Sequence, residues 1–270
     1  MICFIHIERA GGTTLHHIFR NNYASYVTLY PWYYWANEEA NVFSKSEAEH
    51  LFKWIPRPPA FGGHTSRSYL GYEDVLKTSI EYITFVRNPV SRYLSHYHYQ
   101  NHVMKRNWTI EAYLDESRFS NYMTKRIAGC FDVDKAKDEL ANRFGFVGIT
   151  ERFDESLLLM KKVLGLKIIK PYYEIKNAVP VAQKNEEIDK YSEQIIQNNS
   201  LDIELYRFVE DELFASYISN YGASLEGELL ELSEINKTYK FPLYMKISRA
   251  LYRLMYYRNV EYFVKILFHA

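Results

Sequence analysis

Three short apolar segments, each followed directly by a helix-like segment, constrain the fold of this chain most. Residues 2–7 lead through a Gly-Gly turn into the helix-like sequence TLHHIFRNNY, and residues 82–86 precede a helix expected over 90–103. Residues 145–149 repeat the arrangement. Alternating strands and helices predict an α/β fold with a central parallel sheet flanked by helices. Ligands of such sheets gather beyond the carboxyl ends of the strands.

The remaining segments are predicted as loops or as C-terminal helices. The Tyr/Trp-rich stretch 30–35, the Pro-rich stretch 56–59 and the glycine-bearing stretch 61–72 have loop character. After residue 180 the pattern becomes helical, over 186–197, 201–220 and 243–268.

The chain length favours one domain. Its 270 residues with 47% hydrophobic content suffice for one sizeable core, expected over 1–235. The basic, aromatic segment 236–270 is expected to pack on that domain as a helix. Because this segment combines Lys and Arg with Leu, Tyr, Met and Phe, peripheral contact with a membrane or an anionic glycan is the alternative.

Charge and cysteine content narrow the class of protein. The 33 basic and 33 acidic residues balance, so we expect no nucleic-acid partner, and any anion site must be local. Two cysteines, Cys3 and Cys130, do not form a disulfide framework and fit a reducing compartment. Because no apolar run reaches about eighteen residues and no charged leader precedes the first strand, we expect a cytoplasmic protein.

The loop after the first strand has the composition of an oxyanion cradle. Gly11 and Gly12 let the backbone approach a ligand, and the N–H groups that open the next helix point toward it. Thr13 and Thr14 add hydroxyl donors, and Arg9 adds a fixed positive charge. An ordinary strand-to-helix turn is the alternative. The nucleotide triphosphatase loop G-x-x-x-x-G-K-[ST] is not matched, which argues against metal-dependent phosphoryl transfer.

A second anion site is predicted at the end of the 82–86 strand. Arg87 ends this strand, and Ser91 and Ser95 follow on one helix face. A guanidinium group with a hydroxyl suits a phosphate, so we expect Arg87 and Ser95 to bind one and Arg92 to be a solvated helix residue. Two strand-end anion sites on one sheet predict a ligand with two separated anionic groups, such as a 3′,5′-bisphosphorylated adenosine.

These motifs resemble those of carbohydrate sulfotransferases of the heparan-sulfate 2-O and related bacterial type. FIHIERAGGTTL is similar to the 5′-phosphosulfate loop FIHIPKTGGTSL, and FVRNPVSRYLSHY to the 3′-phosphate motif FLRDPVERFLSHY. Further matches are FGGHTSR, NYMTKRIAG, FVGITERFDESLLLMKKVLGL and NNSLDIELYRF, so the resemblance covers residues 2–217. It implies a P-loop-like domain that moves a sulfuryl group from 3′-phosphoadenosine 5′-phosphosulfate to a hydroxyl, without a metal.

The resemblance also implies a role for each matched residue. The donor site would consist of Arg9, Gly11, Gly12, Thr13, Thr14, Leu15, Arg87, Ser95 and Lys184. The loop residues would hold the 5′-phosphosulfate, Arg87 and Ser95 the 3′-phosphate, and Lys184 would come from a loop that closes over the donor. His64 would be the base that takes the acceptor proton, and Arg9 would stabilise the departing oxygen. The product would be adenosine 3′,5′-bisphosphate.

Glu8-Arg9-Ala10 stands where the family has Pro-Lys-Thr. Arg9 stays protonated, so it neutralises charge but donates no proton. Glu8 would lower donor affinity unless its carboxylate turns away or pairs with an arginine. The alternatives are therefore a catalytically degenerate relative that binds nucleotide or glycan, and an ATP-dependent small kinase built on the same sheet.

The acceptor is expected to be an oligo- or polysaccharide. The aromatic faces of Trp32, Tyr33 and Trp35 suit sugar stacking or, alternatively, packing. The substrate-lining residues are expected to be Arg67, Asn121 and Arg126. The guanidinium group of Arg67 or Arg126 would meet an acidic group of the acceptor. The other histidines match no zinc-ligand spacing. His6 is expected to pack at the strand end. A surface or packing position, with the cleft as an alternative for His96 or His98, is expected for His16, His17, His96, His98 and His102.

Overall fold

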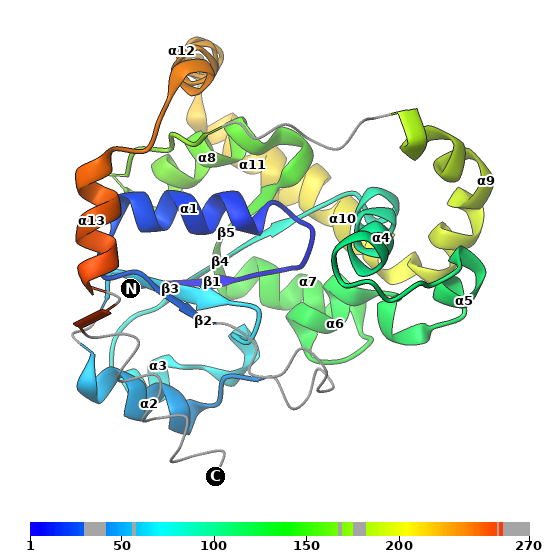
Figure 1. The fold of residues 1–270 in the computed structure, drawn as a ribbon, viewed down its shortest axis with the longest axis horizontal. Coiled ribbons are helices and arrows are strands. Elements are labelled where there is room, and N and C mark those ends of the chain that lie inside the picture. The colour runs from blue at the N-terminus through cyan, green and yellow to red at the C-terminus, as the bar shows by residue number, and fades with distance from the viewer. Residues whose placement is uncertain (30–41, 56–57, 167–168, 175–181, 253, 256–270) are drawn as a thin grey trace.

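The computed structural model describes residues 1–29, 42–55, 58–166, 169–174, 182–252 and 254–255, with 182–189, 249 and 252 described as backbone only. The described chain forms an α/β fold around one parallel sheet (Figure 1). Its strands are β1 (Ile2–Ile5), β2 (Val27–Leu29), β3 (Ala60–Gly63), β4 (Glu81–Val86) and β5 (Phe144–Ile149). They lie in the order β2-β3-β1-β4-β5, and every neighbouring pair is parallel. The predicted fold class is confirmed.

The strand register sets the position of the functional loops. Ile5, the last residue of β1, pairs with Gly63 of β3 on one side and with Thr84 of β4 on the other. The loops that follow β1, β3 and β4 therefore begin at the same edge of the sheet. The side chains of β1 are buried, and Cys3 and Ile5 have no exposed surface. A fully buried central strand fits the continuous apolar sequence of residues 2–5.

Helices cover both faces of the sheet. Figure 1 shows α1 (Gly12–Asn22), α8 (Phe153–Val163) and α11 (Ala215–Tyr221) above it, and α2 (Lys45–Trp54) and α3 (Glu73–Leu76) below it. Helix α2 begins at a capping box, in which Ser44 Oγ accepts from the Glu47 N–H and Glu47 Oε2 accepts from the Ser44 N–H. Helices α6 (Tyr122–Ala128), α7 (Val133–Asn142) and α10 (Ser200–Phe208) pack together.

Helix α4 (Pro89–His98) begins as the sequence predicts. Asn88 Oδ1 accepts from the Ser91 N–H at 3.1 Å, and Pro89 occupies the first turn. The helix continues as a π-helical segment over Tyr99–Val103. Together with α5 (Ile110–Leu114) and α9 (Ala182–Asn198), α4 encloses a second, smaller hydrophobic cluster beside the carboxyl edge of the sheet (Figure 1). Its buried members are Tyr93, Leu94, Ile110, Tyr113, Leu114 and Ile195.

Strands β2 and β3 were not predicted, and the assignment of 61–72 as a loop is wrong at its start. Residues 61–63 belong to β3, where two glycines give a strand the composition of a turn. A Cβ at Gly63 would lie 1.9 Å from the Leu29 carbonyl oxygen of β2. The glycine is therefore needed because the neighbouring backbone lies too close for any side chain.

The C-terminal part is helical, as expected. Helices α9, α10 and α11 cover the predicted segments, with a π-helical segment at Val209–Phe214. Helix α12 (Leu225–Thr238) was not predicted, and it spans the domain boundary expected at residue 235. Helix α13 (Leu243–Tyr252) begins where expected, and most of the predicted remainder lies outside the described residues. Packing of this segment on the domain stays a prediction. No helix in the described ranges is long and apolar enough to cross a membrane.

Candidate active site

The loop after β1 folds tightly over a buried histidine. Arg9 and Gly11 both have left-handed backbone conformations, with φ of 67° and 76°. A Cβ at Gly12 would lie 2.0 Å from Nε2 of His6, so the first residue of α1 must be a glycine. The loop therefore brings its backbone against the end of β1, as an anion cradle requires.

The free N–H groups of this loop are fewer than the sequence predicts. The N–H groups of Thr14 and Leu15 donate to the Gly11 carbonyl oxygen at 3.1 and 3.3 Å. The N-cap of α1 is Gly11, which has no side chain to cap the amides of Gly12 and Thr13. These two amides, with the threonine hydroxyls, are the loop donors best placed for an anion. The side chain of Leu15 is fully buried and serves the core.

The two predicted anion sites are in direct contact. Arg9 Nε donates to Ser95 Oγ at 3.1 Å, and Arg87 Nη1 donates to the Arg9 carbonyl oxygen at 3.0 Å. The Arg9 guanidinium also lies 5.1 Å from the ring centre of Tyr99. Residues separated by about eighty positions in the sequence thus form one polar strip at the ends of β1 and β4.

Arg87 forms an ion pair with Glu151 but keeps one hydrogen-bond donor that the described residues do not satisfy. Its Nε is buried and has no hydrogen-bond partner among the described residues, although Glu151 Oε1 lies 3.7 Å away. Burial lowers the pKa of Arg87, Glu151 opposes this effect, and the nearby charge of Arg9 adds to it. A buried donor without an acceptor, close to a second guanidinium, fits a phosphate or sulfate group. The residues present therefore suit the anionic donor that the resemblance implies.

The prediction that Arg92 is solvated is wrong. Its side chain is almost fully buried, and Nη2 donates to the Phe119 carbonyl oxygen at 3.2 Å. Its guanidinium lies 4.9 Å from the ring centre of Tyr122 and favours the charged form of buried Asp202. Arg92 therefore holds α4 to the α6–α10 layer.

His64 follows β3 and reaches the same edge of the sheet. Its ring stacks on His6, with 3.9 Å between the ring centres, and its Nδ1 lies 3.6 Å from Glu8 Oε1. Burial lowers the pKa of His64 to about 4, Glu8 opposes this shift, and Arg126 and Arg67 reinforce it. The imidazole is therefore neutral at pH 7 and able to accept a proton.

Arg67 and Arg126 lie beside His64, and their contact with a substrate stays a prediction. Both side chains are buried, and they donate to backbone oxygens around His64. Arg67 Nη1 donates to the carbonyl oxygens of His64 and Ser66 at 2.8 and 2.9 Å, and Arg126 Nη2 donates to those of His64 and His6. These arginines fix the backbone that carries the imidazole.

Asn121 joins two helices, and its predicted substrate contact stays a prediction. Its Oδ1 accepts from the N–H groups of Leu201 and Asp202 at the start of α10, at 3.0 and 3.3 Å. In return, Asp202 accepts from the N–H groups of Met123 and Thr124 at the start of α6. The two helices thus cap each other.

Glu8 pairs with histidines and not with an arginine. Its Oε2 lies 3.1 Å from His96 Nε2, while Oε1 faces His64. Burial opposes ionisation, but the hydrogen bond from His96 and the charges of His64, His96 and Arg126 hold the pKa of Glu8 well below its usual range. Sequence analysis does not pair His96 with Glu8, because His96 lies on α4 and 88 positions separate it from Glu8.

Two more histidines extend the cluster into the core. His6 Nδ1 lies 3.1 Å from His16 Nε2, and His16 Nδ1 lies 2.7 Å from the Tyr26 hydroxyl. Burial is the main cause that lowers the pKa of both imidazoles well below the usual value. The packing role predicted for His6 and His16 is confirmed. In the described part of the chain, no group of three or more His, Cys, Asp or Glu side chains could hold a metal ion.

Several predicted residues cannot be placed. Trp32, Tyr33 and Trp35 lie outside the described residues. Lys184 lies in α9, where the structure describes its backbone but not its side chain. Their roles stay predictions.

Comparison with known proteins adds one finding. Residues 1–209 match the family model described as the sulfotransferase family. The matched region runs from β1 through α10 and ends at Val209, the first residue of the π-helical segment Val209–Phe214. No curated protein matches the chain.

Proposed function

The chain belongs to the sulfotransferase family, and from this premise we propose that its donor is 3′-phosphoadenosine 5′-phosphosulfate, its acceptor a glycan hydroxyl and its base His64. The observation that carries the proposal is the contact between Arg9, Ser95 and Arg87 at the ends of two adjacent strands. One bisphosphorylated nucleotide could engage both halves of this polar strip. A simple nucleoside phosphate would need only one half.

Each half of the strip suits one end of the donor. The amides of Gly12 and Thr13 and the charge of Arg9 would bind the 5′-phosphosulfate. Arg87, with its unpartnered Nε, and Ser95 would bind the 3′-phosphate. The donor would then replace the Arg9–Ser95 hydrogen bond with contacts to its own oxygens.

The residues divide the work of an in-line displacement. Arg9 and the loop amides would stabilise the negative charge that grows on the departing bridging oxygen. His64, neutral at pH 7, would take the proton of the acceptor hydroxyl as the new S–O bond forms. Arg67 and Arg126 would act indirectly, because they hold the His64 backbone.

Binding and turnover together test the proposal. Isothermal titration of the full chain is expected to show adenosine 3′,5′-bisphosphate binding more tightly than ATP, with no change on addition of EDTA. Turnover would be measured with labelled donor and a panel of glycans. Arg9→Ala and His64→Ala are each expected to lower kcat/KM by about a hundredfold or more.

The matched control is Arg118→Ala. The Arg118 side chain is 59% exposed, and its ion pair with Glu116 lies outside the polar strip. This variant should keep the wild-type rate. Magnesium-dependent preference for ATP would instead support a small kinase, and binding without turnover would support a catalytically degenerate relative. Near-normal turnover in both site variants would remove Arg9 and His64 from the mechanism.

A further inference from the structure

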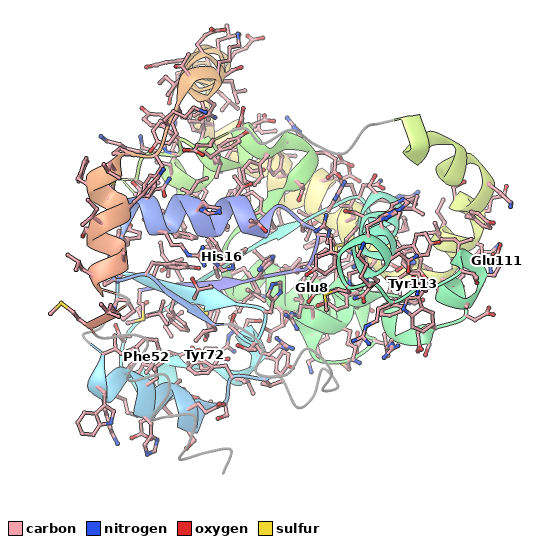
Figure 2. All side chains as sticks on the ribbon, viewed as in Figure 1. Glu8, His16, Phe52, Tyr72, Glu111 and Tyr113 are labelled. Carbon is pink, nitrogen blue, oxygen red and sulfur yellow. The ribbon has the colours of Figure 1, made fainter. Side chains whose placement is uncertain are left out.

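Glu8 lies where it can act on the proposed base. Figure 2 shows Glu8 between the end of β1 and helix α4, on the side of the sheet where the loops after β1, β3 and β4 meet. One carboxylate oxygen is 3.6 Å from His64 Nδ1, and the other is 3.1 Å from His96 Nε2. The carboxylate therefore bridges two imidazoles that come from β3 and α4.

The surroundings hold this bridge in place. His96 is held on the opposite side of its ring from Glu8, because its Nδ1 hydrogen-bonds the Tyr113 hydroxyl. His64 is fixed through its backbone by Arg67 and Arg126 and through its ring face by His6. The carboxylate is already within hydrogen-bond distance of His96, and only a small approach separates it from a hydrogen bond with His64.

The charges around His64 give the carboxylate a clear electrostatic role. Arg67 and Arg126 both disfavour a protonated His64, and only Glu8 favours it. His64 Nδ1 is buried and has no hydrogen-bond partner among the described residues, and Glu8 Oε1 lies 3.6 Å from it. A small approach would complete the bond. An imidazolium formed here without Glu8 would be a buried cation beside two other cations.

We propose that Glu8 is a positioning residue for His64, and that His96 holds the Glu8 carboxylate in the orientation that this role requires. This inference rests on the proposed function. The proton on Nδ1 would face Glu8, which leaves Nε2 to receive the acceptor proton. In the transfer step the acceptor O–H bond breaks, its proton moves to Nε2, the acceptor oxygen bonds sulfur, and the bond from sulfur to the departing oxygen breaks. The imidazolium then returns its proton to water.

The arrangement has the logic of a carboxylate–histidine pair, in which the carboxylate fixes the tautomer and stabilises the imidazolium. The arrangement also explains how an acidic residue can stand beside an anion site. The Glu8 carboxylate faces His64 and His96, which reduces its repulsion of an anionic donor.

The test combines kinetics with a direct measurement on the imidazole. In Glu8→Gln we expect kcat to fall by about a hundredfold, while KM for the donor changes by less than about threefold. Glu8→Asp should recover part of kcat, and His96→Gln should give a smaller loss than Glu8→Gln. The control for loss of one negative charge is Asp74→Asn, which removes a partner of Lys45 from an exposed ion pair and should leave kcat unchanged.

Histidine-selective NMR provides the readout that does not need turnover. The signal of His64 is assigned by its absence in His64→Ala, and its pKa is followed in the wild type and in Glu8→Gln. Because Glu8 favours the protonated imidazole against Arg67, Arg126 and burial, the pKa of His64 should fall in Glu8→Gln. A merely structural role for Glu8 would leave this pKa unchanged.

The outcomes separate the two proposals. If the wild type neither binds adenosine 3′,5′-bisphosphate nor turns over, the proposed function fails, whatever the NMR titration shows. If the wild type is active and His64→Ala is not, but Glu8→Gln keeps the wild-type kcat, the positioning role is wrong and the function stands. If Glu8→Gln fails to fold, His96→Gln and Glu8→Asp decide in its place: unchanged kcat and unchanged His64 pKa in both would overturn the inference.

Discussion

The buried His6 and His16 and the partly buried His64 should make this protein unusually sensitive to mild acid. His6, His16 and His64 all have pKa values lowered chiefly by burial. A histidine in an unfolded chain has a pKa near 6.5. Below this pH these three imidazoles are protonated in the unfolded chain but stay neutral in the folded chain. The free energy of unfolding is therefore highest above pH 6.5 and falls as the pH drops toward the folded-state pKa values.

The magnitude follows from the shifts. For His64, the interval between the ordinary pKa near 6.5 and about 4 corresponds to about 3 kcal/mol lost by pH 4. Three such groups together give a slope of about 4 kcal/mol per pH unit well below pH 6.5. Because domains of this kind have total stabilities of about 5–15 kcal/mol, the fold should be lost within about two to four pH units below 6.5. The pKa of Glu8 is lower in the folded chain than in the unfolded chain, so ionised Glu8 stabilises the fold at neutral pH. This stabilisation decreases only below about pH 5, as the carboxylate of the unfolded chain becomes protonated.

Urea unfolding followed by circular dichroism at pH 7.5, 6.5, 6.0 and 5.5 measures this slope. Proton uptake at pH 5.5, obtained calorimetrically in buffers of different ionisation enthalpy, should lie between two and three protons per chain, about the number of buried imidazoles in the cluster. His16→Asn should lower this uptake by about one proton. A free energy of unfolding that stays flat between pH 7.5 and 5.5, or an uptake well below one proton, would refute the assignment of these imidazoles as neutral and buried.

Two further substitutions test the anion loop and the helix caps. Gly12→Ala places a methyl group against His6 Nε2 and should weaken binding of adenosine 3′,5′-bisphosphate at least about tenfold, as measured by isothermal titration. The control Gly227→Ala, in an open helical position, should leave this binding unchanged. Equal binding in both variants would show that the loop tolerates a side chain. Asp202→Ala leaves the buried amide of Thr124 without its acceptor and should lower the free energy of urea unfolding by about 3 kcal/mol, and a loss below about 1 kcal/mol would mean that the cap contributes little.

The parts of the fold that the sequence predicts are those with local signals. Strands β1, β4 and β5 are short apolar runs that lead into helices. The start of α4 is marked by the capping residue Asn88 and by Pro89 in the first turn. The positions of Arg9, Arg87 and Ser95 at one sheet edge follow from the rule that parallel strands end together. No long-range information was needed for them.

The parts that escaped prediction depend on contacts between distant segments. Strand β3 carries two glycines because a side chain on Gly62 would meet the backbone of β1 at Phe4 and one on Gly63 would meet the backbone of β2 at Leu29. A single sequence does not show which backbones are neighbours. Arg92 is buried because Asp202, 110 positions later, lies near enough to interact with its charge. Arg67 and Arg126 have the charges of substrate-binding residues, but their carbonyl partners become visible only in three dimensions.

The histidine cluster connects the stability of the fold to its proposed chemistry. Burial keeps His64 neutral down to low pH, so in the proposed mechanism the base is ready at every pH at which the fold persists. The same burial weakens the imidazole as a base, since a lower pKa means a weaker pull on the acceptor proton. A carboxylate close to Nδ1 opposes that weakening without adding bulk near Nε2, and in a partly buried site its charge acts more strongly than it would in water. The acid sensitivity expected of the fold and the base strength expected of His64 therefore have one physical origin, and Glu8 is the group that moderates it.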